Sequence, residues 1–367
     1  MKQSLVLLIV LLSLSAQSQD EASEKWFWSV ASGKTNTVRF NRGEWYGYSK
    51  PQMQKMYANI SAVLELVHQT PRLNPPKGFE AAATASICED GCYRNKVLSG
   101  HSILLFRRYY TKPGVKEIQR DVEGPGINFY FNDIRCLVSR LPLNEDEFFP
   151  EPKVVDTIQG FPVYPGSMVV ITKNKKPLFD IVTKERYLQS EIKRKEKDLE
   201  ELKKKAAQGS PYRQWLANKD AVVKGALEGI ALRTKGDPAK EKAEKEKFLK
   251  NIQQQDSMYK ASEASFLSEF NNMINKLAGQ IANDKAKLAS MSQQDRSEAA
   301  MDFYGERRLV TPSKSFFNDA IPASEIQVIV INFNQNRLDE RDVSSYGKLF
   351  REIYRTIDLK SLLPVLK

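Results

Sequence analysis

The chain has 367 residues, of which 41% are hydrophobic and 10% aromatic, so it can bury a core and is not wholly disordered. Its 56 Lys and Arg residues exceed its 45 Asp and Glu residues, which gives a formal net charge of +11. It has only two histidines and no HExxH pattern, which excludes a histidine-rich metal cluster and leaves little choice of histidine base.

Residues 1–18 have the pattern of a secretory signal peptide. Lys2 provides a basic start, residues 5–14 form an apolar run, and Ala16 and Ser18 are small residues before a cleavage point. The run is shorter than the about 20 residues that span a bilayer, which favours a cleaved signal over a membrane anchor. We therefore expect an exported protein, periplasmic or extracellular, whose mature chain loses the one charge of Lys2 and has no transmembrane segment.

Aromatic residues gather near the start of the mature chain, next to one carboxylate. This aromatic cluster consists of Trp26, Trp28, Glu44, Trp45, Tyr46 and Tyr48. Flat aromatic faces stack on sugar rings and a carboxylate accepts hydrogen bonds from hydroxyl groups, so the cluster is the candidate ligand-binding site. The alternative is the edge of a core, because Trp26, Trp28 and Val30 alternate as strand residues that face one way.

The next part of the chain predicts mixed helix and strand. Residues 50–69 predict an amphipathic helix, since apolar residues recur at spacings of three and four and prolines follow. Strand-like runs occupy residues 79–87, 102–110 and 127–131. Residues 168–172 and 178–182 are two apolar runs around a polar, proline-bounded turn, which predicts a hairpin.

Export makes the three cysteines informative. Cys88 and Cys92 flank Asp90-Gly91, a strong turn pair, so we expect a Cys88–Cys92 disulfide at a hairpin tip, with Cys136 buried and unpaired. A redox-active pair is the alternative, but the spacing is not that of C-x-x-C oxidoreductases. A zinc site has too few Cys and His ligands.

Other chemistry-bearing residues are scattered. His68 lies in the predicted helix and His101 before a strand, and no G-x-S-x-G motif accompanies them. The acidic residues Glu145, Asp146, Glu147 and Glu151 lie in a proline-bounded loop with no EF-hand spacing. We therefore predict no catalytic residue, no metal and no cofactor, and we lean against an enzyme.

Residues 183–304 have a helical pattern, with breaks at 209–211 and 236–238. In residues 187–205, Leu188, Ile192, Leu199 and Leu202 form a narrow apolar seam that Lys195 interrupts. A third helix, residues 239–292, carries the near-heptad series Phe266, Phe270, Met273, Leu277, Ile281, Asp284, Leu288 and Met291. Residues 183–304 contain 24 Lys and Arg and 19 Asp and Glu, and the two signs are interleaved. This pattern is typical of solvated helices as well as of polyanion binding.

After residue 304 the strand pattern returns. Residues 325–333 form a continuous apolar run, typical of a strand covered on both faces, and an amphipathic helix begins at Ser344 or Ser345. So small a piece cannot cover such a strand alone. We expect it to dock on the N-terminal region; an independent C-terminal domain is the alternative.

The sequence thus predicts an α+β protein with a signal peptide (1–18), an α+β region (19–182), a coiled-coil-like helical insertion (183–304) and a docking strand–helix segment (305–367). We expect a non-enzymatic binding or assembly protein of the cell envelope or exterior, whose helical arm contacts a partner protein or a second copy. The alternative is a glycan-binding or glycan-hydrolysing module that uses the aromatic cluster. A glycan or polyanion is a possible ligand, and export argues against nucleic acid.

Overall fold

The computed structural model describes residues 34–40, 48–87, 97–110, 119–138, 146–208 and 210–367. The chain divides into two compact units. We call the unit of Met1–Pro142, Glu147–Ile181 and Asp302–Lys367 the body, and the unit of Leu143–Asp146 and Val182–Met301 the arm. The predicted α+β class is confirmed: N- and C-terminal parts build a mixed body, and the arm is a long helical insertion.

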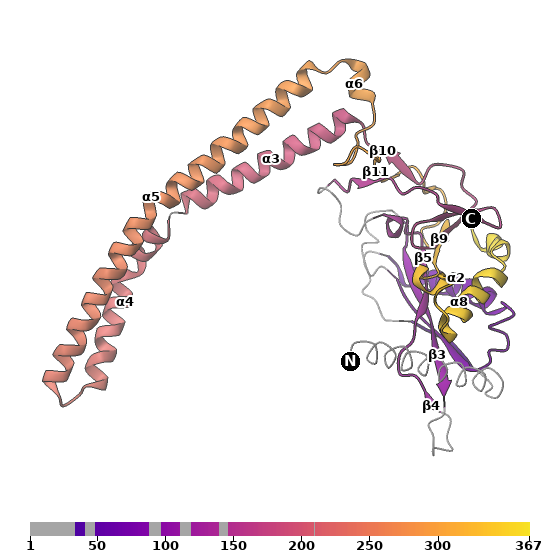
Figure 1. The fold of residues 1–367 in the computed structure, drawn as a ribbon, viewed down its shortest axis with the longest axis horizontal. Coiled ribbons are helices and arrows are strands. Elements are labelled where there is room, and N and C mark those ends of the chain that lie inside the picture. Colours follow the sequence, from indigo (N-terminus) through magenta and orange to yellow (C-terminus); the bar gives the residue numbers. More distant parts are fainter. Residues whose placement is uncertain (1–33, 41–47, 88–96, 111–118, 139–145, 209) are drawn as a thin grey trace, which may run out of the picture. The chain divides into compact units, whose positions relative to one another are not determined.

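A nine-stranded sheet runs through the body (Figure 1). Its strands are β1 (Lys34–Phe40), β2 (Phe79–Ile87), β3 (Gly100–Tyr110), β4 (Gln119–Arg120), β5 (Gly126–Phe131), β7 (Asp156–Ile158), β8 (Phe161–Tyr164), β9 (Met168–Thr172) and β12 (Val328–Asn332). Their order is β1-β2-β3-β5-β12-β9-β8-β7, with β4 beside β3. β1 and β2 are parallel, and the other pairs are antiparallel.

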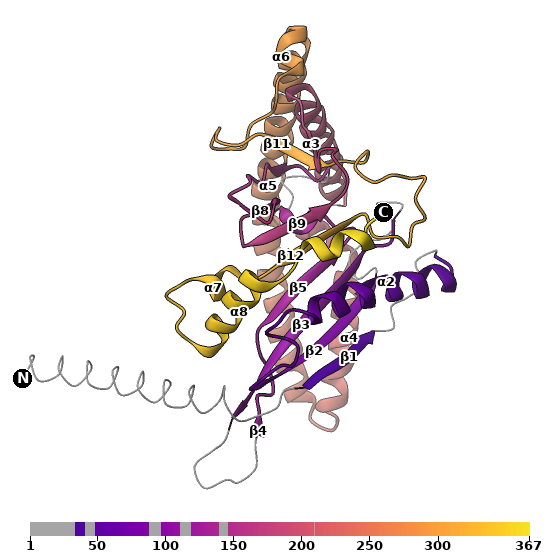
Figure 2. The ribbon, with the colours of Figure 1, turned by 90° about the vertical axis from the view of Figure 1, so that its right-hand side faces the viewer.

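Three helical elements cover one face of this sheet, as Figure 2 shows for the first two. They are α2 (Lys50–His68), α8 (Ser345–Thr356) and the 3-10 helix η3 (Lys360–Val365). The apolar stripe expected for α2 is buried against the strands, through Met53, Met56, Ile60, Val63, Leu64 and Val67. Residues of one strand face, such as Leu104 and Phe106 of β3, complete the core.

A second core lies on the other side of β12 and β9. Val328 and Val330 of β12 belong to it, whereas Ile329 and Ile331 belong to the core under α2 and α8. Phe316 and Phe317, in the loop before β12, also pack there. β12 is therefore covered on both faces, as its continuous apolar pattern predicts.

A small sheet completes the body. It consists of β10 (Phe179–Ile181), β11 (Leu309–Pro312) and β6 (Phe149–Pro150), with β11 in the middle. The predicted hairpin of residues 168–172 and 178–182 is therefore wrong: β9 pairs with β8 and β12, and β10 pairs with β11. The segment between β9 and β10 is instead bonded to the C-terminal part of the chain: Lys173 Nζ donates to Leu366 O at 2.7 Å, and Asn174 Nδ2 donates to Phe316 O.

Asn132 ties the C-terminal strand into the sheet. Its fully buried amide donates to Leu98 O (3.0 Å) and Glu325 O (2.8 Å), and its Oδ1 accepts from the Gln327 N–H at 2.7 Å. Its φ of 54° lies in the left-handed region, which asparagine tolerates better than most residues. One side chain thus satisfies backbone groups from two distant segments.

The arm consists of α3 (Lys184–Ala207), α4 (Pro211–Arg233), α5 (Pro238–Ser290) and the short α6 (Gln293–Ser297). Each long helix begins at a capping side chain: Thr183, Ser210 and Asp237 accept from backbone N–H groups of the first turns. The predicted breaks at 209–211 and 236–238 are therefore helix boundaries. No helix in the described part of the chain is both long and apolar enough to cross a membrane.

Candidate functional site

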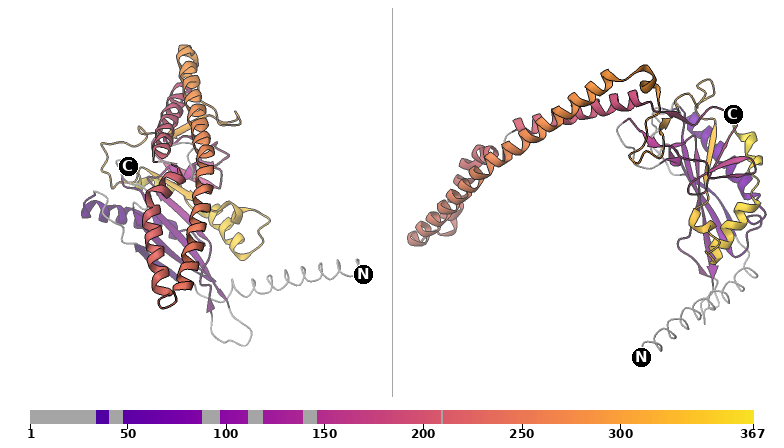
Figure 3. Two further views of the ribbon diagram at one scale, coloured as in Figure 1. Left: turned by 90° about the vertical axis from the view of Figure 1, so that its left-hand side faces the viewer. Right: turned by 45° about the horizontal axis from the view of Figure 1, so that its top comes forward.

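The arm is a helical hairpin, with α5 lying beside α3 and then α4 (Figure 3). Lys195 pairs with Asp284 and Lys219 pairs with Asp256, so residue numbers rise on one side as they fall on the other. The helices are therefore antiparallel. With 53 residues, α5 is about 80 Å long.

The part of the arm formed by α3 and the end of α5 has an apolar seam. Leu188, Ile192 and Ile281 are buried there, and Leu199, Leu277, Leu288 and Met291 pack against them. Met273, expected in the seam, is 50% exposed, and Ile274 is shielded instead. Both positions follow Phe270 at helical spacing, and the alignment with the opposite helix selects one of them.

The two polar residues that interrupt the predicted seams meet each other. Lys195 Nζ lies 2.5 Å from Asp284 Oδ2, and both side chains are about four-fifths shielded, with 20% and 21% of their surface exposed. Lys285 and Glu196, the next residue on each helix, form a second pair at 2.6 Å with the charges exchanged. Sliding one helix by a turn would break both pairs, so they specify the alignment of α3 on α5.

A polar and aromatic contact joins α4 to α5. Trp215 Nε1 and Lys219 Nζ each donate to Asp256 Oδ1 at 3.0 Å, and the Trp215 ring stacks on Tyr259 with centroids 5.7 Å apart. Hydrogen bonds from Lys219 and Trp215 hold the pKa of Asp256 below its ordinary value. This contact holds α4 against α5, although few apolar side chains are buried between the two helices.

The distal half of the arm, which we define as residues 211–263, has more large apolar side chains that are exposed than apolar side chains that are fully buried. Its buried apolar side chains are Ile230 and Ile252. Leu232 and Met258 are 76% and 72% exposed. Its other exposed large apolar residues are Leu216, Val222 and Leu249. Large exposed apolar surfaces commonly mark interaction sites.

A shallow groove of about 410 Å³ lies between α3 and α5. Leu199, Ala278 and Ile281 provide apolar lining, and Glu196, Glu200 and Lys285 are the charged residues around it. The groove has the composition of a helix-packing surface, and no nucleophile or histidine lines it.

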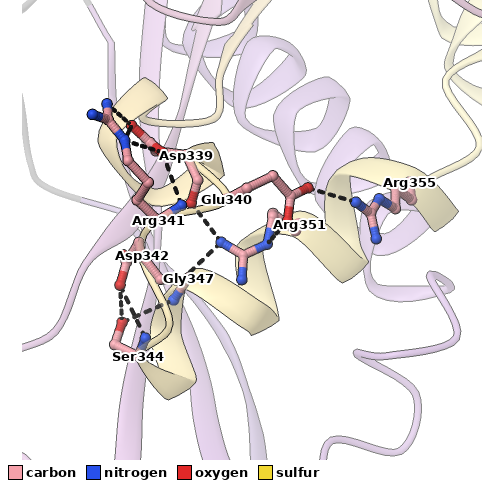
Figure 4. A network of polar contacts seen from close by, with 8 residues as sticks. All are labelled: Asp339, Glu340, Arg341, Asp342, Ser344, Gly347, Arg351 and Arg355. Carbon is pink, nitrogen blue, oxygen red and sulfur yellow. Dashed lines mark hydrogen bonds and ion pairs between the residues drawn. The ribbon is translucent and has the colours of Figure 1, made fainter. Parts of the chain in front are cut away.

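The body contains a dense ionic network at the start of α8 (Figure 4). Arg351 Nη1 donates to Asp339 O (2.7 Å) and Asp342 O (2.9 Å), while Glu340 pairs with Arg351 and Arg355. Arg341 lies 2.6 Å from Asp339 and lowers the pKa of that carboxyl to about 2. The charges are paired with one another, so the network stabilises the turn before α8 and is not built to hold a ligand.

Most of the aromatic cluster lies outside the described residues, namely Trp26, Trp28, Glu44, Trp45 and Tyr46. Tyr48 is described: it is half-buried and packs against the core under α2, and burial raises its pKa. For this one member the core-edge alternative fits, and the glycan site as a whole stays a prediction.

Of the cysteines, Cys88 and Cys92 lie outside the described residues. Cys136 is a free thiol, as expected, but the residue is half-buried and not fully buried; its Sγ donates to Asp133 O at 3.2 Å. Burial raises the pKa of the Cys136 thiol well above its ordinary value. It is therefore poorly suited to act as a thiolate nucleophile.

The two histidines lie in different elements, His68 at the end of α2 and His101 in β3. His68 is half-buried near the end of α2, and burial lowers its pKa. The His101 ring stacks on Tyr130, with centroids 4.9 Å apart, and its Nε2 lies 3.2 Å from Asn128 Oδ1. The alternation of Asn128 and Tyr130 in their strand could have predicted that they share a face; which strand pairs with it could not be read from the sequence.

The acidic loop is dispersed in the structure. Asp146 accepts from Ser190 Oγ, Glu151 pairs with Arg308 at 2.8 Å, and Glu145 lies outside the described residues. In the described part of the chain no three Asp, Glu, His or Cys side chains are grouped to hold a metal ion.

A scan against protein-family models and searches of curated proteins and of solved structures found no match to this chain.

Proposed function

We propose that this is an exported, non-enzymatic binding or assembly protein whose helical arm contacts a partner protein or a second copy. The observation that carries the proposal is the distal half of the arm, where exposed Leu232 and Met258 contrast with only two buried apolar side chains. The pattern of residues 1–18 supports export.

The arm is also built to keep a defined alignment. Capped helices and the Lys195–Asp284 and Lys219–Asp256 pairs hold the hairpin in one alignment. A helix gains most of its stability from packing of an apolar face, and a two-helix hairpin can cover only one such face. Coverage of the distal half by another helical surface would remove its exposed apolar groups from water.

The first test is the oligomeric state of the full chain, measured by sedimentation over a range of concentrations. Self-association should weaken in Leu232→Gln/Met258→Gln, because the substitutions remove exposed apolar groups without disturbing the seam. Val122→Gln/Val343→Gln changes two exposed side chains of the body and is the matched control.

A second test addresses a partner protein other than a second copy of this chain. A photo-crosslinking residue placed at position 232 or 258 and expressed in the source cell should give a discrete adduct, and one at position 122 should not. A chain that is monomeric at every concentration and gives no adduct from the arm would contradict the proposal.

The glycan alternative has no comparable support from the described residues. It predicts glycan-array binding that is lost in Trp45→Ala while the fold is retained. Such a result would rank it above arm-mediated assembly.

A further inference from the structure

A single turn of the body presents two aromatic rings to water. Phe303 is 94% exposed and Tyr304 is 78% exposed, and among the residues whose exposure the structure describes no other aromatic side chain is exposed. The two rings contact each other edge to face, with centroids 5.3 Å apart. We call residues 302–307 the aromatic turn.

The aromatic turn is held by its own hydrogen bonds. Gly305 N–H donates to Asp302 O (2.9 Å), and Asp302 N–H donates to Arg307 O (2.8 Å). The buried Asp302 carboxylate accepts from the Glu306 N–H at 2.9 Å and from the Arg307 N–H at 3.3 Å. Gly305 has a φ of +71°, which glycine adopts without steric cost. The rings are thus presented by an ordered backbone.

The charges next to the rings are paired within the body. Arg307 Nε lies 3.3 Å from Asp302 Oδ2, and Arg308 Nε lies 2.8 Å from Glu151 Oε2. The cations of the turn are therefore already neutralised, and a strongly anionic partner would gain little from them.

The size of the patch decides between a protein and a lipid surface. Two aromatic side chains offer at most about 500 Å², well below the about 800 Å² that each partner buries in a stable protein interface. The interface of a bilayer needs no such surrounding area and favours Tyr and other aromatic side chains. We propose that the aromatic turn inserts Phe303 and Tyr304 into the headgroup region of a lipid bilayer. This surface lies in the body and does not depend on the role of the arm.

The test is flotation of the full chain with phosphatidylcholine vesicles. The wild type should float with the vesicles, and Phe303→Ser/Tyr304→Ser should reduce the bound fraction by roughly tenfold. The substitutions are exposed, so an unchanged melting temperature is expected and should be verified. Val122→Ser/Val343→Ser, two exposed valines of the body, should bind as the wild type does. Adding phosphatidylglycerol or salt should change the ratio of wild-type to double-variant binding by less than about twofold, because the cations of the turn are paired.

Absence of flotation by the wild type, or equal flotation of the double variant, would overturn the proposal. So would a wild type that sediments as a larger species than Phe303→Ser/Tyr304→Ser in the absence of vesicles, since the turn would then be a contact between copies.

Discussion

The hydroxyl group of Tyr346 joins α8 to the sheet. It donates to Asp121 Oδ2 at 2.8 Å and accepts from the Arg108 N–H at 3.1 Å. Arg108 Nε also pairs with Asp121 Oδ2 at 3.2 Å. Burial, with the hydrogen bond to Asp121, raises the pKa of Tyr346 to about 12. This shift has a consequence for stability at high pH.

Between the unfolded pKa of 10.0 and the folded value of about 12, the folded chain keeps the Tyr346 proton and the unfolded chain loses it. The contribution of Tyr346 to the free energy of unfolding is therefore complete below pH 10. It is lost as the pH rises from 10 to about 12, so the free energy of unfolding should fall over this range. Urea unfolding at about pH 8 and about pH 11 should show a smaller decline in the free energy of unfolding for Tyr346→Phe than for the wild type; the difference should be about 1 kcal/mol or less, because Tyr346 is only partly buried. Tyr304→Phe, at an exposed position, should leave the decline unchanged.

Gly347 lies in the first turn of α8, where a side chain has no room. A Cβ atom there would lie 2.3 Å from Asp342 O, and the Gly347 N–H donates to Ser344 Oγ at 3.1 Å. Helix propensity alone predicts that Gly→Ala stabilises a helix by roughly 1 kcal/mol.

We expect the opposite sign for Gly347→Ala, a loss of about 2 kcal/mol, because the turn in Figure 4 must move. Gly279→Ala on α5, where a Cβ would meet nothing within 4 Å, should follow propensity and gain up to about 1 kcal/mol. Chemical denaturation of both variants checks the pair. Two changes of the same sign would show that the contact at Asp342 does not decide the effect.

At the scale of elements, we expect the Lys195–Asp284 pair to contribute to the stability of the arm. Lys195→Leu leaves a carboxylate in the seam without its partner, so the arm should lose about 1–3 kcal/mol. Lys195→Leu/Asp284→Leu restores an apolar seam and should recover this loss. Thermal unfolding followed by circular dichroism measures both.

A matched control for this pair is Lys203→Leu, which breaks the exposed pair with Glu200 and should change stability by about 0.5 kcal/mol or less. A double variant less stable than Lys195→Leu would contradict the role of the pair in stability.

The elements also show what local patterns can predict. The expected strand 79–87 and the helix starts at Thr183 and Ser344 agree with the structure, because alternation and capping depend on neighbouring residues. Strand pairing depends on distant residues. The β9–β10 hairpin was wrong for that reason: β12, more than 150 residues away, pairs with β9 instead.

At the scale of the whole molecule, the position of β12 predicts how the cut chain behaves. Because β12 lies between β5 and β9, a protease cut between α4 and α5, near Gly236, should leave the body in one piece. Size exclusion should show a single species, and the two fragments should separate only in denaturant. Separation of the two fragments without denaturant would contradict this organisation of the body.

The α+β class, the helical insertion and the apolar faces of α2 and β12 could be predicted from the sequence, because they follow from local periodicity. The sequence also showed that part of the net positive charge lies on the arm, where basic and acidic residues are interleaved. Three features could be seen only in the folded chain: Lys195 pairs with Asp284, Asn132 anchors the C-terminal strand, and Phe303 and Tyr304 are exposed. Each of these depends on which distant segments lie together, and a residue's chemical type does not carry that information.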